Sequence, residues 1–233
     1  MSNKEGKQAA IRFDILSLFP EYFEGPFSLS IIGRARKKGL LNISLIDIRD
    51  FGLGKYQQVD DRPYGGGPGM VLMVEPVVKA IRSVKNEGSH VIYLTPQGSP
   101  LTAKRCRELS TKPHLVVLCG HYEGIDERAI ELEVDEEVSI GDFVLTSGAP
   151  AAIVFVDSVS RFVPGVIGNE TATDLDSFEN GFFDSPVFTR PNFFEGKRVP
   201  EVLQQGNHAQ IEAWRRDMAR KKTRQVRPDL YEN

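Results

Sequence analysis

Apolar and polar positions along the first two-thirds of the chain follow two alternating patterns. Residues 11–19 and 41–48 are strand-like, whereas residues 30–38 and 75–85 have the spacing of amphipathic helices. Gly39 is expected to end the first of these helices, since glycine readily adopts the conformation that terminates a helix. Alternating strands and helices predict an α/β domain.

Three further runs, at residues 90–94, 115–119 and 151–156, are short and apolar throughout. Helical segments separate them, and none alternates with polar residues as a half-exposed strand does. Such runs are typical of strands buried on both faces of a parallel sheet. We therefore expect all three to be strands of one parallel sheet.

The pattern changes at residues 165–180, which are small, polar and without periodicity, and which predict a linker or mobile loop. A helix is expected from Asn207 to Lys222, because the Asn207 side chain can cap its first turn and Gln210 can reach back. Apart from an apolar face, this helix is crowded with basic residues: Arg215, Arg216, Arg220, Lys221 and Lys222.

The 233-residue chain has room for one large domain and a small one, and its composition is that of a soluble globular protein. No apolar run approaches the roughly 20 residues of a membrane helix. Residues 1–10 lack the apolar core of a secretory signal. Cys106 and Cys119 have no C-x-x-C spacing, which favours a reduced, cytosolic protein with neither a disulfide framework nor a zinc site.

The net charge of −3 conceals an asymmetry between the two ends of the chain. Residues 190–233 hold 10 Lys/Arg and 6 Asp/Glu, a balance of +4, and the other 189 residues hold 19 and 26, a balance of −7. A basic tail on an acidic body indicates a polyanionic partner for the tail. A solvated helix face is the alternative interpretation.

Residues 62–70 form a segment of four glycines and two prolines that a helix or strand does not accommodate. An apolar run follows at once, so we expect a loop built into a folded domain that brings main-chain groups close to a ligand. A Walker phosphate loop is excluded, because Met70 follows Gly69 where Lys and Ser or Thr are needed. A tight surface turn is the alternative.

Glycine-containing loops lie beside three of the predicted strands, at residues 95–98, 120–128 and 139–145. Ligands of parallel α/β sheets bind beyond the carboxyl ends of the strands, and main-chain groups suit the edge of an adenine. The loops therefore predict a shared small-molecule site, unless each is a plain turn.

Residues 123–142 carry nine acidic residues against one basic residue, Arg128. This segment is either a solvated acidic face or a negative environment for a cationic ligand such as a sulfonium or a hydrated Mg²⁺. Asp174 and Asp176 follow in the polar loop, where aspartate is usually a turn former. Either would become a stronger base if loop closure buried it and raised its pKa. The four histidines show neither metal-ligand nor triad spacing, although His121 could line the predicted pocket.

Taken together, these motifs resemble the bacterial tRNA (guanine-N1)-methyltransferase family. The matching segments occur in family order and span about residues 11 to 225. They are Val59–Met70, Tyr93–Gly98, Cys119–Arg128, Ser139–Leu145, Asp157–Gly165 and Asp176–Phe178.

The resemblance implies a trefoil-knotted α/β methyltransferase domain at residues 11–166 and a flexible linker at 167–180. A basic helical tRNA-binding domain would follow at 181–233, and residues 1–10 would be a disordered extension. The family acts as a cytoplasmic homodimer, away from membranes, with its site at the subunit interface. Its substrate would be a tRNA anticodon stem-loop with guanine at positions 36 and 37, methylated on N1 of guanine 37.

The resemblance also implies the residues of the site. Asp176 would take the proton of guanine N1, and Arg161 would stabilise the charge that develops on the base. No metal ligand is implied, and Mg²⁺ is a second cofactor candidate beside S-adenosylmethionine. The positions that match the S-adenosylmethionine site are Tyr93, Leu94, Pro96, Gly120, Glu123, Ile140, Gly141, Asp142, Phe143, Val144, Leu145 and Gly148.

Two positions depart from the family pattern. His121 stands where arginine is common, and Ser147–Ala152 replaces Gly-Gly-Glu-Leu-Pro-Ala, which removes a carboxylate and shifts a proline. Two alternative functions stay open at this point. One is a knotted methyltransferase acting on another RNA position, and the other is an RNA-binding protein of the same fold without methyl transfer.

Overall fold

The computed structural model describes residues 10–168, 173 and 176–231. Residues 1–9 of the predicted extension, and Asp174, lie outside the described residues. The chain divides into two compact units, residues 1–168 and 169–233, which are described separately below. The predicted domain boundaries, with a linker at 167–180, stay a prediction.

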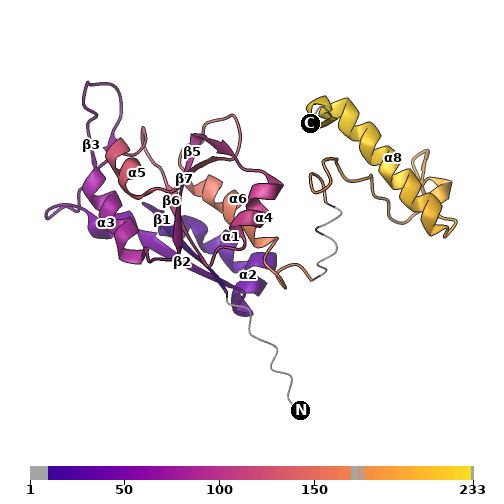
Figure 1. Cartoon of the computed structure of the whole chain (residues 1–233), viewed down its shortest axis with the longest axis horizontal. Coiled ribbons are helices and arrows are strands. Elements are labelled where there is room, and N and C mark those ends of the chain that lie inside the picture. Colours follow the sequence, from indigo (N-terminus) through magenta and orange to yellow (C-terminus); the bar gives the residue numbers. More distant parts are fainter. Residues whose placement is uncertain (1–9, 169–172, 174–175, 232–233) are drawn as a thin grey trace, which may run out of the picture. The chain divides into compact units, whose positions relative to one another are not determined.

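The first unit is built on a five-stranded sheet in the order β2-β1-β6-β5-β7 (Figure 1). All four strand pairings are parallel. The strands are β1 Ile11–Ser17, β2 Leu41–Asp47, β5 Ser89–Pro100, β6 His114–Cys119 and β7 Glu136–Ser139. This arrangement confirms the predicted α/β class and the parallel sheet. The trefoil knot stays a prediction.

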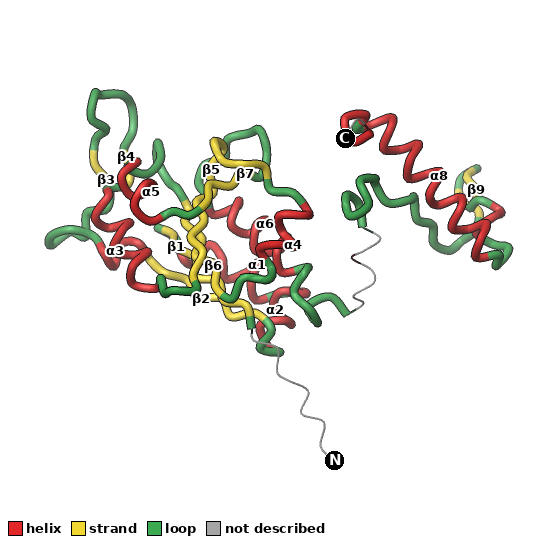
Figure 2. Tube along the Cα trace, viewed as in Figure 1, coloured by secondary structure: helices red, strands yellow, loops and turns green. Residues whose placement is uncertain are grey.

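Helices cover both faces of the sheet (Figure 2). One face packs against α1 Glu24–Ser28, α2 Ser30–Lys37, α4 Ala103–Leu109 and α6 Ala149–Ser160. The other packs against α3 Val74–Val84 and α5 Glu127–Glu133. The run at residues 115–119 of strand β6 is apolar throughout because both faces of the strand are buried. Leu115 and Val117 enter one core, while Val116 and Leu118 enter the other. All four are fully buried, as expected for a central parallel strand.

The prediction of a strand at residues 151–156 is wrong, because these residues lie in helix α6. Pro150 stands in the first turn of this helix, where its missing N–H removes no hydrogen bond. Ala152, Phe155 and Val159 are fully buried at helical spacing, whereas Val154 is 46% exposed. A short apolar run fits a buried helix as well as a buried strand, and the pattern alone does not separate them.

Strand β7 was not predicted, since its four residues include Glu136 and Glu137. The loop at 139–145 therefore follows a strand instead of preceding one. The remaining predicted elements of the first unit are confirmed with shifted ends. Two short strands, β3 Asp60–Asp61 and β4 Val71–Leu72, pair antiparallel on either side of the glycine-rich loop.

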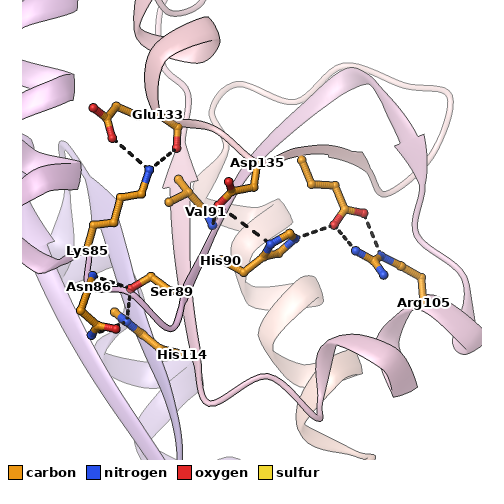
Figure 3. Close-up of polar contacts among 10 residues, drawn as sticks. Lys85, Asn86, Ser89, His90, Val91, Arg105, His114, Glu133 and Asp135 are labelled. Atoms are coloured by element: carbon orange, nitrogen blue, oxygen red, sulfur yellow. Dashed lines mark hydrogen bonds and ion pairs between the residues drawn. The ribbon is translucent and has the colours of Figure 1, made fainter.

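A buried polar group lies at the amino ends of the strands. The His114 ring joins the Ser89 hydroxyl (2.7 Å) to the Asp14 carboxylate (3.0 Å), and the Ser89 and His114 contact is drawn in Figure 3. Arg12 forms an ion pair with Asp14 at 2.6 Å. Burial lowers the pKa of His114, although Asp14 opposes that shift. These bonds satisfy the Asp14 carboxylate, which is fully buried.

The second unit contains one long helix, α8 His208–Val226, and confirms the predicted basic helix. Asn207 caps it as expected, with its Oδ1 accepting from the Gln210 N–H at 3.3 Å. Shorter elements precede and follow it: β8 Phe193–Phe194, β9 Lys197–Arg198, and the 3-10 helices η3 Glu201–Leu203 and η4 Pro228–Tyr231. Among the described helices of both units, none is long and apolar enough to cross a membrane.

Candidate functional site

A cavity of about 550 Å³ opens where β5, β6 and β7 end. The three glycine-containing loops predicted from the sequence all contribute to it. Of the twelve residues expected to bind S-adenosylmethionine, eleven line this cavity and Asp142 does not. The eleven are Tyr93, Leu94, Pro96, Gly120, Glu123, Ile140, Gly141, Phe143, Val144, Leu145 and Gly148.

The position of residues 95–98 follows from an irregularity in β5. Leu94 and Ser99 both pair with Val138 of β7, so the four residues between them form a bulge. A Cβ atom on Gly98 would lie 2.4 Å from the carbonyl carbon of Glu137, so only glycine fits there. The bulge places Thr95, Pro96 and Gln97 in the wall of the cavity.

Glycines bring the backbone of two loops into direct contact beside the cavity. The Gly148 N–H donates to the Gly120 carbonyl at 2.8 Å. A Cβ on Gly148 would lie 2.7 Å from the Gly120 nitrogen, and one on Gly120 would lie 3.0 Å from the Tyr93 hydroxyl. Gly141 has a φ of +150°, which side chains rarely adopt. Main chain therefore forms much of this wall, as the sequence led us to expect.

The cavity is negatively charged. Glu123, Glu127 and Glu137 line it, and no lysine or arginine of the described chain does. Burial raises the pKa of Tyr93, and the charges of Glu137 and Glu127 add to this shift. The surroundings favour a cationic ligand over an anionic one.

Three other carboxylates between residues 123 and 142 join separate elements of the first unit (Figure 3): Glu133, Asp135 and Glu136. Glu133 is buried at the end of α5, where it pairs with Arg82 at 2.6 Å and Lys85 at 3.0 Å. Glu136 accepts from His90 Nε2 and from Arg105 Nε, both at 2.9 Å.

Glu133 and Glu136 both have a lowered pKa. Burial alone would raise the pKa of Glu133 and of Glu136. The hydrogen bonds from their partners lower each pKa by more than burial raises it. The Asp135 carboxylate accepts from the Val91 N–H at 2.8 Å and so joins the start of β7 to β5. Part of the acidic segment therefore positions β7, and only part of it faces the cavity.

The glycine-rich loop reaches the cavity at one end only. The Met70 carbonyl accepts from the Glu123 N–H at 3.0 Å, and a Cβ on Gly69 would lie 2.5 Å from the Glu123 side chain. At the tip, Tyr64 is 99% exposed and a Cβ on Gly65, Gly66 or Gly67 would meet nothing within 4 Å. Residues 65–67 nevertheless have positive φ, which explains the glycines there.

The two predicted catalytic residues lie in different units. Arg161 follows the last turn of α6 in the first unit, where its N–H donates to the Asp157 carbonyl at 3.2 Å and its side chain is exposed. Asp176 lies in the second unit and is half-buried, and its carbonyl accepts from the Glu179 N–H at 3.3 Å.

Sequence reasoning missed Glu127 and Glu137 as residues of the cavity. Both lie in the acidic segment, which the pattern identified without showing which carboxylates turn inward. His121 lines the cavity, with its ring 5.3 Å from that of Phe19. Among the described residues, no group of three or more His, Cys, Asp or Glu is placed to hold a metal ion.

Comparison with known proteins agrees with the motifs. The family model described as "tRNA (Guanine-1)-methyltransferase TrmD" matches residues 11–233. A tRNA (guanine-N(1)-)-methyltransferase of Chlamydia pneumoniae is 60% identical over 223 residues, which are 96% of this chain and 62% of that protein. Its counterpart in Protochlamydia amoebophila is 58% identical over 217 residues, 93% of this chain and 98% of that protein.

The chain thus spans about 62% of the length of the Chlamydia relatives that it matches. Within the matched region the similarity extends over both units. The chain belongs to the tRNA (Guanine-1)-methyltransferase TrmD family.

Proposed function

We propose that this protein transfers a methyl group from S-adenosylmethionine to N1 of a guanine in tRNA. The observation that carries the proposal is the cavity at the ends of β5, β6 and β7, which gathers eleven of the twelve expected donor-binding residues. Relatives at 60% and 58% identity are named tRNA (guanine-N(1)-)-methyltransferase.

The cavity suits the donor in three respects. Main chain at Leu94, Gly120 and Ile140 would hold an adenine edge, because a backbone offers a donor and an acceptor close together. Carboxylates at Glu123 and Glu137 would stabilise the positive sulfonium. The bound donor supplies an electrophilic methyl group. No side chain projects from Gly120, Gly141 or Gly148, which leaves room for a bent ligand.

The target nitrogen must lose its proton before it becomes a good nucleophile. We assign Asp176 as the base that accepts the N1 proton of guanine, and Arg161 as the cation that stabilises negative charge at O6. The assignment rests on the match of both residues to the family motifs. It requires that Asp176 and Arg161 both contact the target base when tRNA is bound.

The second unit and the family resemblance both support the substrate that we propose. Helix α8 exposes Arg216, Arg220 and Arg224, which suits binding to phosphates. We propose an anticodon stem-loop with guanine at positions 36 and 37 as the substrate, and N1 of guanine 37 as the target. A tRNA-modifying role places the protein in the cytoplasm.

We propose in addition that two copies form a homodimer. Phe143 and Val144 line the cavity and are 52% and 84% exposed, an apolar edge that a second copy would cover. Light scattering on the purified chain tests this, and a monomer at micromolar concentration would contradict it.

The function is tested with labelled S-adenosylmethionine and tRNA transcripts that carry guanine or adenine at position 37. We expect label on N1 of guanine 37 only, and loss of transfer with retained donor binding in Asp176→Asn. Asp50→Asn is the matched control, because Asp50 is exposed in the first unit. Reactions with and without EDTA show whether Mg²⁺ takes part.

Three results would change the proposal. Label on another nucleotide indicates a knotted methyltransferase of different specificity. Binding of tRNA without donor binding or transfer indicates a non-catalytic RNA-binding protein. Full activity of Asp176→Asn would remove the assigned base.

A further inference from the structure

A second cavity, of about 530 Å³, lies within the second unit between α8 and two aromatic rings. Its lining residues are Phe182, Asp217, Arg220, Lys221, Arg224 and Tyr231. The four that belong to α8 are spaced at i, i+3, i+4 and i+7, so they share one face of the helix. The helix face and the rings together form a site that the proposed donor cavity does not include.

The aromatic wall is assembled from both sides of α8 in the sequence. The rings of Phe182 and Tyr231 lie 5.2 Å apart at an angle of 58°. Tyr231 reaches this position because η4 turns back after the helix, and its hydroxyl donates to the Arg220 carbonyl at 3.0 Å. Arg227, at the end of α8, pairs with Asp229 of η4 at 2.7 Å. The ring is thus held by hydrogen bonds as well as by packing.

Guanidinium groups lie over both rings. The Arg220 guanidinium is 5.7 Å from the centre of the Phe182 ring, and that of Arg224 is 5.0 Å from the centre of the Tyr231 ring. A guanidinium placed on an aromatic face keeps its N–H groups at its edge, where they can donate to a further partner. In the described part of the chain, no carboxylate lies within ion-pair distance of Arg220, Lys221 or Arg224.

The combination of groups defines the ligand. Three cations favour an anion, and the aromatic rings offer surface on which a planar base stacks. Asp217 would repel a bare phosphate, but its carboxylate can accept from a base amino group or a ribose hydroxyl. All of these groups are satisfied together by a whole nucleotide, in which phosphate, sugar and base are joined.

We propose that this cavity binds one unpaired nucleotide of the tRNA, distinct from the guanine that is methylated. Its phosphate would lie against Arg220, Lys221 and Arg224, and its base against Tyr231. The inference rests on the proposed function for its partner, since it takes tRNA to be the RNA that is bound. It adds a contact that reads a single-stranded nucleotide by stacking, beside the sequence-independent contacts of the basic helix.

The decisive comparison is between Tyr231→Phe and Tyr231→Leu. The first keeps the ring and removes the hydroxyl, whereas the second keeps apolar bulk and removes the ring. We expect Tyr231→Phe, whose ring still packs against Phe182, to bind tRNA as the unaltered protein does. Tyr231→Leu should bind about 10-fold more weakly, because the stacking surface for one base is lost. The dependence of binding on salt should be unchanged in Tyr231→Leu, because no phosphate contact is lost.

Arg224→Gln tests the phosphate contact, with Arg215→Gln as its matched control on the opposite face of α8. Arg224→Gln should weaken tRNA binding and reduce the salt slope by about one. Because Arg215 is paired with Glu212 at 3.1 Å, its loss should have a smaller effect. Equal effects of the two substitutions would show that only the overall charge of the helix matters, and would overturn the site.

The outcomes separate this proposal from the proposed function. If tRNA binds and is methylated on N1 but Tyr231→Leu binds it as tightly as Tyr231→Phe, this proposal alone fails. If the unaltered chain binds no tRNA, both fail. Titration with guanosine or adenosine monophosphate distinguishes the two sources of a nucleotide. Micromolar binding of either one, together with unchanged tRNA binding by Tyr231→Leu, would overturn the assignment to RNA.

Discussion

Glu136 joins the edge strand β7 to two residues outside that strand, Arg105 and His90. Strand β7 has four residues and pairs only with β5 in the sheet order, yet Glu137, Val138 and Ser139 line the first cavity. Glu136→Gln keeps the shape of the side chain and replaces one acceptor oxygen by an NH₂ donor. That donor would face N–H groups of Arg105 or His90, so at least one charge-assisted hydrogen bond is lost.

The contacts of Glu136 determine how much stability the protein loses in Glu136→Gln. The Glu136 side chain is 18% exposed, so solvent screens its bonds little, and hydrogen bonds to charged groups contribute about 1.5–3 kcal/mol each. Loss of one bond should therefore reduce the free energy of unfolding by about 2 kcal/mol. At about 2–4 °C per kcal/mol for a domain of this size, the Tm should fall by roughly 4–8 °C.

Thermal unfolding of the protein and of Glu136→Gln at neutral pH measures this difference. Glu131→Gln is the matched control, since Glu131 is exposed on α5 in the same acidic segment, and its change should stay within about 0.5 kcal/mol. The hydrogen bonds hold the pKa of Glu136 below its ordinary value of 4.5, so the stabilisation is complete above that pH and is lost as pH falls through the lowered pKa.

The difference between protein and variant should therefore be full at pH 7 and shrink in acid. If Glu136→Gln has the same Tm as Glu131→Gln at pH 7, the Arg105 and His90 contacts do not hold β7 in place. A difference that grows on acidification would also refute the reasoning.

Three further outcomes are expected. Gly148→Ala should lower affinity for S-adenosylmethionine at least 10-fold by calorimetry, because its Cβ would lie 2.7 Å from the Gly120 nitrogen, whereas Gly168→Ala, with open space around it, should not. Tyr93 should keep its proton above pH 10, because burial raises its pKa, and Tyr93→Phe should remove one transition above pH 10 from an ultraviolet titration of the protein. Burial raises the pKa of the Cys119 thiol to about 12, so a disulfide reagent at pH 8 should modify it only after denaturation.

The sequence predicted strands β5 and β6 because their short apolar runs are typical of strands buried on both faces of a parallel sheet. Strand β6 is the clearest case, with all six residues buried. The same criterion failed for residues 151–156. This run is as apolar as that of a buried strand, but it lies in helix α6. It also missed β7, since Glu136 is held by partners distant in sequence, Arg105 and His90, which no local pattern reveals.

The candidate cavity was predictable for a different reason. Glycine loops such as the one at Gly120 mark places where main chain approaches main chain, and that need is local to the sequence. The charge of the cavity was not predictable, because Glu127 faces it while Glu133 pairs with Lys85, although both belong to the same short helix. Which carboxylates turn inward is decided by tertiary contacts.

The segment Ser147–Ala152, which departs from the family pattern, contributes to the lining of the first cavity. Helix α6 starts within it: Pro150 lies in the first turn, and the Ser147 hydroxyl accepts from the Ala149 N–H at 3.4 Å. The segment therefore keeps the backbone that joins Gly148 to Gly120 while carrying no carboxylate. Because Glu123, Glu127 and Glu137 still line the cavity, its negative charge does not depend on the residue that the departure removes.

Donor binding should thus be more sensitive to loss of Glu137 than to a glutamate restored at Ala149, and calorimetry on Glu137→Gln and Ala149→Glu decides between them. Tighter binding in Ala149→Glu together with unchanged binding in Glu137→Gln would contradict this argument.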